Sequence, residues 1–144
     1  MEAVKKSSFK LTQFIVKEFN ITREAVKQGK VELGLKPSGV IDDNSKIFKL
    51  ILEVSCKDTT GSFNITLTAF GFFEFKDEKS ADTLSNYFYI NAPALIFPYI
   101  RAYISSVTAL SGLRAVNLPV MNLTSLKNEL RTNTIKEKVV KITG

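Results

Sequence analysis

The sequence predicts an α+β domain in which a four-stranded antiparallel sheet, over about residues 9–76, precedes a long helix and a shorter second helix, over about 92–131. Apolar and polar residues alternate through the first half of the chain, as in strands with one buried face. Apolar residues recur at helical spacing in the last third. Strands that all precede the helices favour an antiparallel sheet. The 144 residues fit a single domain with a basic tail over 132–144.

The first two strands differ in their patterns. Residues 9–21 carry apolar side chains of both parities, which indicates a long strand with a bulge or bend. Residues 31–36 alternate strictly between apolar and other residues, as in a half-buried strand. Turn-forming residues fill positions 37–45, so we expect the second strand to end there.

The next two strands form a hairpin. Residues 48–56 alternate between apolar and other residues, and Asp-Thr-Thr-Gly at 58–61 is typical of a hairpin loop. The returning strand runs from Phe63 to Phe75.

The end of this fourth strand is aromatic on both parities. Phe70 and Phe72 point to one face of the sheet, and Phe73 and Phe75 point to the other. Both faces of the strand must therefore be covered by other parts of the protein. If one cover is missing, an exposed aromatic surface results, and such a surface usually marks a binding site.

Two helices follow the strands. The first is indicated by apolar residues at helical spacing, namely Ile96, Ile100, Tyr103, Val107 and Leu110. Pro93 suits a helix start and Gly112 suits a stop. Residues 116–122 have the composition of an extended linker. We expect a second helix from Asn122 or Thr124, with one apolar face made by Leu123, Leu126 and Leu130.

The long helix lies in a segment, residues 83–113, whose only charged residue is Arg101. A helix this apolar in a small protein has to be covered on more than one side. One sheet covers one side, so we expect other subunits to cover the rest. Assembly is therefore the first property that the sequence predicts.

Catalysis is not expected. The chain has no histidine and one cysteine, which excludes Ser-His-Asp and Cys-His sites and zinc sites built on cysteine and histidine. Cys56 shares the parity of the buried residues of its strand and fits a small hydrophobe. Asp42 and Asp43 lie among turn residues, where aspartate serves local hydrogen bonding. We therefore predict no enzyme activity, no cofactor and no metal.

The sequence also predicts a cytoplasmic protein without membrane insertion. Residues 1–8 do not have the apolar core of a signal peptide. The uncharged segment contains Asn86, Asn91, Pro93 and Pro98, unlike a bilayer-spanning helix.

Residues 91–106, Asn-Ala-Pro-Ala-Leu-Ile-Phe-Pro-Tyr-Ile-Arg-Ala-Tyr-Ile-Ser-Ser, resemble the helix signature of SecB, a protein-export chaperone family. Residues 116–123, Val-Asn-Leu-Pro-Val-Met-Asn-Leu, are similar to the SecB segment that joins its two helices. Residues 9–18 match its first strand more loosely, and residues 48–75 fit its central hairpin by pattern alone.

The resemblance implies an ATP-independent holdase that binds unfolded or pre-secretory polypeptides in apolar grooves and keeps them competent for translocation. It also implies a homotetramer, built as a dimer of dimers with long helices between sheets. We expect the client groove to include Val40 and Ile41 in a crossover loop, with Phe70, Phe72, Phe73, Leu123, Leu126 and Leu130. We expect the oligomer interface to include Ile96, Ile100, Tyr103, Ile104 and Val107.

The chain departs from the family in its charge. SecB chains are typically acidic, whereas this chain has a net charge of +6. Acidic residues on SecB sheets dock the SecA motor. Here Glu18 matches one such position, while Thr22 and Thr66 occupy others. The lysine-rich end over 132–144 also differs from the SecB tail that contacts SecA. An alternative is therefore a SecB-like chaperone dedicated to the antitoxin of a toxin–antitoxin pair.

Two other classes remain as alternatives. A nucleic-acid-binding protein would use the basic tail and stack bases on the phenylalanines, but residues 70–75 contain no basic residue between those rings. A small-molecule or lipid carrier would hold its ligand in a cavity under the sheet.

Overall fold

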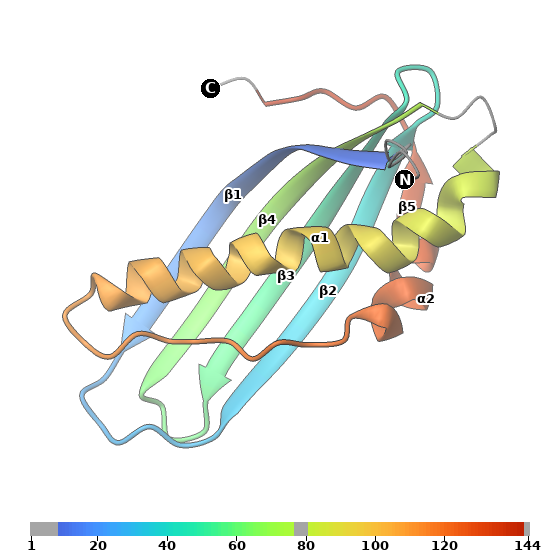
Figure 1. Ribbon diagram of the computed structural model, residues 1–144. Coiled ribbons are helices and arrows are strands. Elements are labelled where there is room, and N and C mark those ends of the chain that lie inside the picture. The colour runs from blue at the N-terminus through green and yellow to red at the C-terminus, as the bar shows by residue number, and fades with distance from the viewer. Residues whose placement is uncertain (1–8, 77–80, 143–144) are drawn as a thin grey trace, which may run out of the picture.

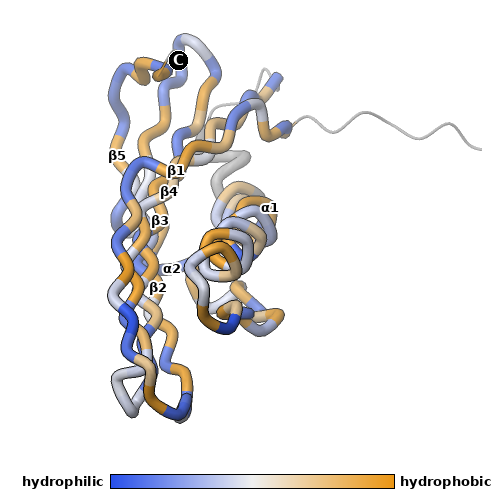
Figure 2. The backbone as a smooth tube through the Cα atoms, turned by 90° about the vertical axis from the view of Figure 1, so that its left-hand side faces the viewer, coloured by the Kyte–Doolittle hydropathy of each residue, from blue (hydrophilic) through white to orange (hydrophobic). Residues whose placement is uncertain are grey.

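The computed structural model describes residues 9–76 and 81–142, with side chains placed from residue 88 onward in the second range. A single sheet of five strands forms one layer, and a long helix lies across one face of it (Figures 1 and 2). The spatial order is β1-β4-β3-β2-β5. The strands are β1 (Phe9–Arg23), β2 (Val31–Asp42), β3 (Ile47–Asp58), β4 (Phe63–Phe75) and β5 (Thr134–Lys136).

The α+β class is confirmed, and the number of strands in the prediction is wrong by one. After the last helix the chain returns along the free edge of β2, and β5 pairs with β2 in parallel, with Ile135 opposite Val40. Backbone hydrogen bonds from Gly39 N to Asn133 O and from Glu137 N to Ile41 O flank this pairing. Three residues are too short to show an alternating pattern, so this strand could not be recognised in the basic tail.

β2 does not end at Pro37, contrary to the expected break over 37–45. It continues to Asp42, and the turn occupies residues 43–46. The N–H of Gly39 points away from β3, toward β5, and Pro37 has the same parity as Gly39. The missing N–H of Pro37 therefore faces the edge of β2 before β5 begins, where it removes no ladder hydrogen bond. Val40 and Ile41 consequently lie in a strand and not in a crossover loop.

The long β1 strand is bulged, as its mixed parity predicts. The register with β4 shifts between Leu11 and Gln13 and again between Val16 and Glu18. The second shift lies between Phe14 and Phe19 and allows both rings to face the helix although they are five positions apart.

The long helix α1 (Ala81–Ala109) begins about three turns earlier than the expected start near residue 92. Pro93 and Pro98 lie inside it and not at its N-terminus. Phe88 explains the early start, because its buried ring contacts Phe9, Phe48 and Phe75 and fixes this part of the helix on the sheet. The stop near Gly112 agrees with the structure, since this glycine has a φ of +85° shortly after the helix ends.

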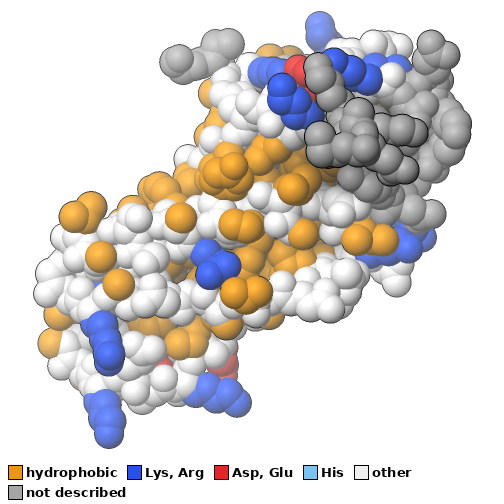
Figure 3. All heavy atoms as spheres, in the orientation of Figure 1, with side chains coloured by type: hydrophobic (Ala, Val, Ile, Leu, Met, Phe, Trp, Pro, Cys, Tyr) orange, Lys and Arg blue, Asp and Glu red, His pale blue; other side chains and the backbone are white. Residues whose placement is uncertain are grey.

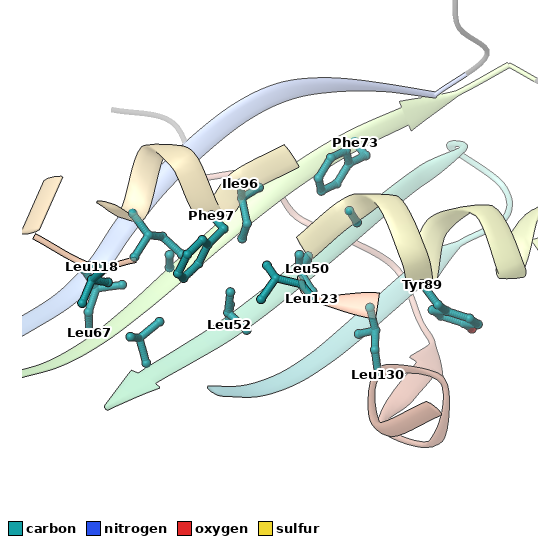
Figure 4. Packing of buried hydrophobic residues seen from close by; sticks show 14 of the residues in the cluster. Leu50, Leu52, Leu67, Phe73, Tyr89, Ile96, Phe97, Leu118, Leu123 and Leu130 are labelled. Atoms are coloured by element: carbon teal, nitrogen blue, oxygen red, sulfur yellow. The ribbon is translucent and has the colours of Figure 1, made fainter. Parts of the chain in front are cut away.

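A linker returns beside α1 to a short 3-10 turn η1 (Thr124–Leu126) and the helix α2 (Lys127–Thr132) (Figure 1). The expected start of the second helix is therefore confirmed. The core lies between α1 and the facing side of the sheet. Figure 4 shows Ile96 and Phe97 of α1 above Leu50, Leu52, Leu67 and Phe73 of the strands. Leu118, Leu123 and Leu130 extend this core beyond the helix.

Candidate functional site

Exposed apolar side chains gather along the outward side of α1 and on the linker after it. Figure 3 looks onto this side and shows apolar side chains with few charges among them. We call the following six residues the α1 surface: Leu95, Tyr99, Leu110, Leu113, Val120 and Met121. Each exposes at least 39% of its area. A cluster of exposed apolar side chains of this kind is typical of a protein-binding surface.

The outward face of α1 is fixed by how the inward face packs. Ile96, Ile100 and Ile104 are completely buried against the sheet. α1 lies close to β4 at Gly71, where a Cβ atom would lie only 2.7 Å from Cγ2 of Ile96. A glycine at this point lets the helix lie low on the sheet, so its outward face is held rigidly.

Two aromatic pairs join α1 to the edge strand β1. The ring of Tyr99 stacks on Phe14 with centroids 5.4 Å apart, and Tyr103 meets Phe19 edge-on at 5.3 Å. Within the described residues, β1 pairs with β4 alone. Its other edge therefore presents backbone N–H and C=O groups next to the α1 surface, and an extended peptide can pair with such an edge.

Arg23 holds the start of the linker against the end of α1. Its Nη1 donates to Thr108 O at 3.2 Å and to Ser111 Oγ at 2.9 Å, and its Nη2 donates to Arg114 O at 2.6 Å. The Thr108 hydroxyl accepts a hydrogen bond from Val116 N at 2.8 Å. These contacts set the path of the linker beside the helix.

A hollow of about 260 Å³ lies between α1 and this linker. It is lined by Pro98, Arg101, Ala102, Ser105, Asn117 and Leu118. Within the described part of the chain, the buried Nε of Arg101 has no hydrogen-bond partner. A buried donor without a partner costs free energy. Arg101 also brings the one charge of residues 83–113 to this hollow.

The eight residues expected in a client groove divide between the two faces of the sheet. Ile41 and Phe73 are buried beneath α1, together with Leu123 and Leu130, while Leu126 is half-buried beside them. Phe70 and Phe72 form a separate cluster on the far face with Val139, and Val40 packs against it. The fourth strand is therefore aromatic on both faces, as expected. However, both far-face rings are buried, so no exposed aromatic surface results.

The five residues expected at an oligomer interface lie on one stretch of α1. Ile96, Ile100 and Ile104 are fully buried within this chain, so they cannot touch a second copy directly. Tyr103 is half-buried against β1, and Val107 is also half-buried. The accessible apolar residues lie one helical step away, at Leu95 and Tyr99. The uncharged positions 95, 99, 102 and 106 were the signal for this face in the sequence.

Glu18 lies on the far face of the sheet, away from α1. It borders a shallow hollow of about 540 Å³ together with Lys36, Glu53 and Thr66. Thr66 brings a hydroxyl group to this hollow. The face therefore mixes acidic, basic and hydroxyl side chains.

The groups with shifted pKa values have local structural causes. Burial raises the pKa of Cys56 to about 11, so its thiol stays protonated. Hydrogen bonds from Val139 N and from Ser45 lower the pKa of Asp42 to about 2. Burial would raise the pKa of Asp58, but hydrogen bonds from Ser62, Gly29 and Thr60 outweigh it and lower this pKa to about 2. These carboxylates fasten loops and do not form a pair suited to acid–base chemistry.

Within the described residues, no three histidine, cysteine or carboxylate side chains lie together in a way that could hold a metal ion. Nor does any helix in that part of the chain combine the length and apolarity needed to cross a membrane.

Comparison with solved structures finds the same fold in Rv1957, a SecB-like chaperone of Mycobacterium tuberculosis in complex with a ChAD peptide from the Rv1956 HigA1 antitoxin. The TM-score is 0.66 at 12% identity, and the match covers 78% of this chain and 87% of that one. A protein of unknown function from Streptococcus agalactiae matches with a TM-score of 0.43 at 11% identity, over 78% of this chain and 97% of that one.

In sequence, the chain is 31% identical to the uncharacterized protein MJ0357 of Methanocaldococcus jannaschii, over 88% of this chain and 86% of the relative. The family model for SecB, described as preprotein translocase subunit SecB, matches residues 5–133. This match covers β1 to β4, α1, the linker and α2, in the order that the structure shows, and ends just before β5. The chain therefore belongs to the SecB family.

Proposed function

We propose that this chain is a cytoplasmic, ATP-independent holdase that binds unfolded polypeptides at the α1 surface and the open edge of β1. The observation that carries the proposal is the nearly uncharged outward side of α1, which lies beside an unpaired strand edge. Membership of the SecB family supports a chaperone role. The proposed activity needs binding alone and no covalent step.

The two parts of this site supply different kinds of affinity. Burying a half-exposed leucine or methionine contributes on the order of 1 kcal/mol, whatever the client sequence. The edge of β1 adds backbone hydrogen bonds, which are also independent of sequence. Together they favour any extended, apolar segment, which is what an unfolded chain exposes and a folded chain buries.

We assign assembly to the helical part of the α1 surface. Leu95 and Tyr99 lie on a helix that is packed rigidly on the core, and Tyr99 is further held by Phe14. A rigid, uncharged face suits the same face of a second copy. The proposed assembly is a homotetramer, a dimer of dimers in which these helices meet.

We assign client binding to the linker part, with Leu110, Leu113, Val120 and Met121. These residues lie outside regular helix and strand, and methionine adapts its shape to different partners. Leu123 and Leu130 support the linker from beneath. Arg101 lines the hollow beside it and gives this part of the site a positive charge.

Two client classes fit this site. Exported proteins are the clients implied by the family name, and SecA would then dock at Glu18. An antitoxin is favoured by the solved structure of Rv1957, which holds an antitoxin peptide. The positive charge of this chain and the threonines at 22 and 66 favour the second class, because SecA docking uses acidic residues.

Aggregation of a chemically unfolded, slowly folding protein tests the proposal. We expect the purified chain to suppress aggregation at about equal molar amounts without ATP. The double substitution Val120→Glu and Met121→Glu should weaken client binding roughly tenfold, since each 1.4 kcal/mol lost is a factor of ten. Labelled client and fluorescence anisotropy measure the affinity.

Val26→Glu is the matched control, because Val26 is an exposed valine in the loop between β1 and β2. Its client affinity should stay within twofold of the unmodified chain. If the unmodified chain fails to hold the client, or if the control loses as much affinity as the double variant, the proposal is wrong.

A further inference from the structure

The C-terminal segment 137–142, which we call the strap, crosses the far face of the sheet. It leaves β5 with Glu137 N donating to Ile41 O, and Val139 N then donates to Asp42 Oδ2 at 3.0 Å. Lys141 Nζ reaches Glu74 Oε1 on β4 at 3.2 Å, and Gln13 Nε2 on β1 donates to Ile142 O at 3.2 Å. The strap therefore passes over all four long strands, from β2 to β1 (Figure 1).

A single side chain of the strap closes an apolar cluster. Val139 is 9% exposed and packs with Phe70 and Phe72, while its neighbour Val140 is 73% exposed. Half-buried apolar residues complete the cluster, namely Ile15, Val40, Ile47 and Ile51. This cluster is separate from the main core beneath α1.

Two lysine side chains lie next to the Phe70 ring at the border of the cluster. Lys49 Nζ lies 4.1 Å from the centroid of the Phe70 ring, and Lys17 Nζ lies 5.4 Å from the same centroid. Burial, and after it the charge of Lys17, lowers the pKa of Lys49. The Phe70 ring thus has two ammonium groups near it, and the cluster to which it belongs is completed by Val139 of the strap.

The contacts that hold the strap are few and easily exchanged. Beyond Glu137 its backbone makes no ladder with a strand within the described residues. Apart from the packing of Val139, its contacts are one N–H to a carboxylate, one partly exposed ion pair and one side-chain hydrogen bond. Exposed ion pairs contribute little to stability. Another extended segment can make the same contacts. It needs a backbone N–H that donates to Asp42, an apolar side chain at the position of Val139 and a cation that pairs with Glu74.

We infer that the strap is a displaceable cover over a second polypeptide site on the far face of the sheet, distinct from the α1 surface. The site takes an extended segment that carries a β-branched residue and, two positions later, a lysine or arginine, as Val139 and Lys141 do in the strap. The chain's own segment competes for the site, so only a segment of matching pattern displaces it. This inference stands independently of the proposed holdase activity.

A labelled peptide with the sequence of residues 136–142, Lys-Glu-Lys-Val-Val-Lys-Ile, is the probe. In full-length chains, Val139→Ser should release the strap and raise peptide affinity at least tenfold over the unmodified chain. Val140→Ser is the matched control, because it makes the same change at the exposed neighbour, and its peptide affinity should stay within twofold. Fluorescence anisotropy gives the affinities, and circular dichroism confirms that each variant is folded.

Charge exchange tests the cation contact. A peptide with glutamate in place of its last lysine should lose at least fivefold on the Val139→Ser chain and recover when Glu74→Lys is added. Should Val139→Ser not fold, Lys141→Glu releases the strap through repulsion by Glu74 and leaves the apolar cluster intact. Equal peptide binding to all chains, or none to a folded released chain, would overturn the inference, whatever the aggregation assay shows.

Discussion

Cys56 shows how far burial alone fixes the behaviour of one residue. Its side chain is fully buried in the core, and this burial raises its pKa to about 11. We therefore expect no alkylation by iodoacetamide at pH 8 in the native chain and complete alkylation in 6 M guanidinium, as mass spectrometry would record. Rapid modification of the native protein would contradict this packing.

The carboxylate of Asp58 ties the loop before β2 to the hairpin between β3 and β4. It accepts hydrogen bonds from Gly29 N at 2.8 Å, from Thr60 Oγ1 at 2.8 Å and from the Ser62 hydroxyl. Its pKa is about 2 in the folded chain, against a usual value of 3.8. A lowered pKa stabilises the fold above pH 4, and this contribution is lost as the pH falls from about 4 to 2.

Asp58→Asn should therefore lower the melting temperature by several degrees at pH 7 and by less at pH 2. Asp43→Asn is the control, because Oδ1 of Asp43 has no hydrogen-bond partner among the described residues. Calorimetry at both pH values measures the effect. An equal loss at pH 7 and at pH 2 would show that the charge of Asp58 does not contribute.

For single residues, the sequence predicted which face of the sheet a side chain points to. It did not predict which residues from distant parts of the chain contact that side chain. The sequence indicated that Cys56 is buried and that Phe70 and Phe73 face opposite ways, because side chains alternate along a strand. It did not indicate that Val139 covers Phe70, since that contact joins positions 69 apart in the chain through a tail with no pattern.

At the scale of elements, the contact between α1 and β4 depends on Gly71. Gly71→Ala would place a Cβ 2.7 Å from Cγ2 of Ile96, in a packed core that cannot yield freely. We expect a loss of about 1–3 kcal/mol in the free energy of unfolding, the usual range for overpacking. Urea denaturation measures it.

Gly34→Ala is the matched control in the same sheet. A Cβ there would lie 3.8 Å from Ser55 Cβ, which is an ordinary contact, on a face without a helix. Alanine should leave stability unchanged or raise it by up to about 1 kcal/mol, because glycine costs entropy in a strand. Equal losses in both variants would mean that α1 does not lie as low on β4 as described.

The elements with regular patterns were predictable, and their ends were less so. The alternation over 48–56 identified β3, and the mixed parity over 9–21 identified the bulged β1. The end of β2 was misplaced because Pro37 is a turn former in general, yet here its missing N–H faces an unpaired edge. The start of α1 was misplaced because Phe88, packed on three other aromatic rings, outweighs the local signal of Pro93.

For the whole molecule, the proposed assembly through α1 gives a direct prediction. Leu95→Glu places a charge at the centre of the outward face, where it would have to be desolvated against a second copy. Light scattering should show about four times 16.1 kDa for the unmodified chain and a smaller mass for this variant.

Val26→Glu is again the control, because Val26 is exposed to a similar degree, 53% against 43% for Leu95, and lies in a loop away from α1. Its mass should match that of the unmodified chain. A monomeric unmodified chain, or equal masses for all three, would refute assembly through this face.

At the molecular scale the sequence indicated that α1 needs more than one cover, because residues 83–113 carry a single charge. It could not divide that stretch correctly between the chain's own sheet and the outside. The prediction placed Ile96, Ile100 and Ile104 at the interface, whereas the sheet buries them and leaves Leu95 and Tyr99 accessible. Rotating α1 by one residue would exchange the buried and the accessible positions. The rotation is fixed by the packing of α1 on β4, which the sequence pattern does not contain.

The two edges of the sheet differ in how much of each edge is paired with another strand. β5 pairs with only Gly39 to Ile41 of β2, whereas within the described residues the whole outer edge of β1 is unpaired. A very short edge strand that carries a lysine, as β5 carries Lys136, is a poor template for a further strand, whereas the long edge of β1 is a good one. A client strand bound along β1 would therefore also prevent two sheets from joining through that edge, so client binding and edge-to-edge association exclude each other.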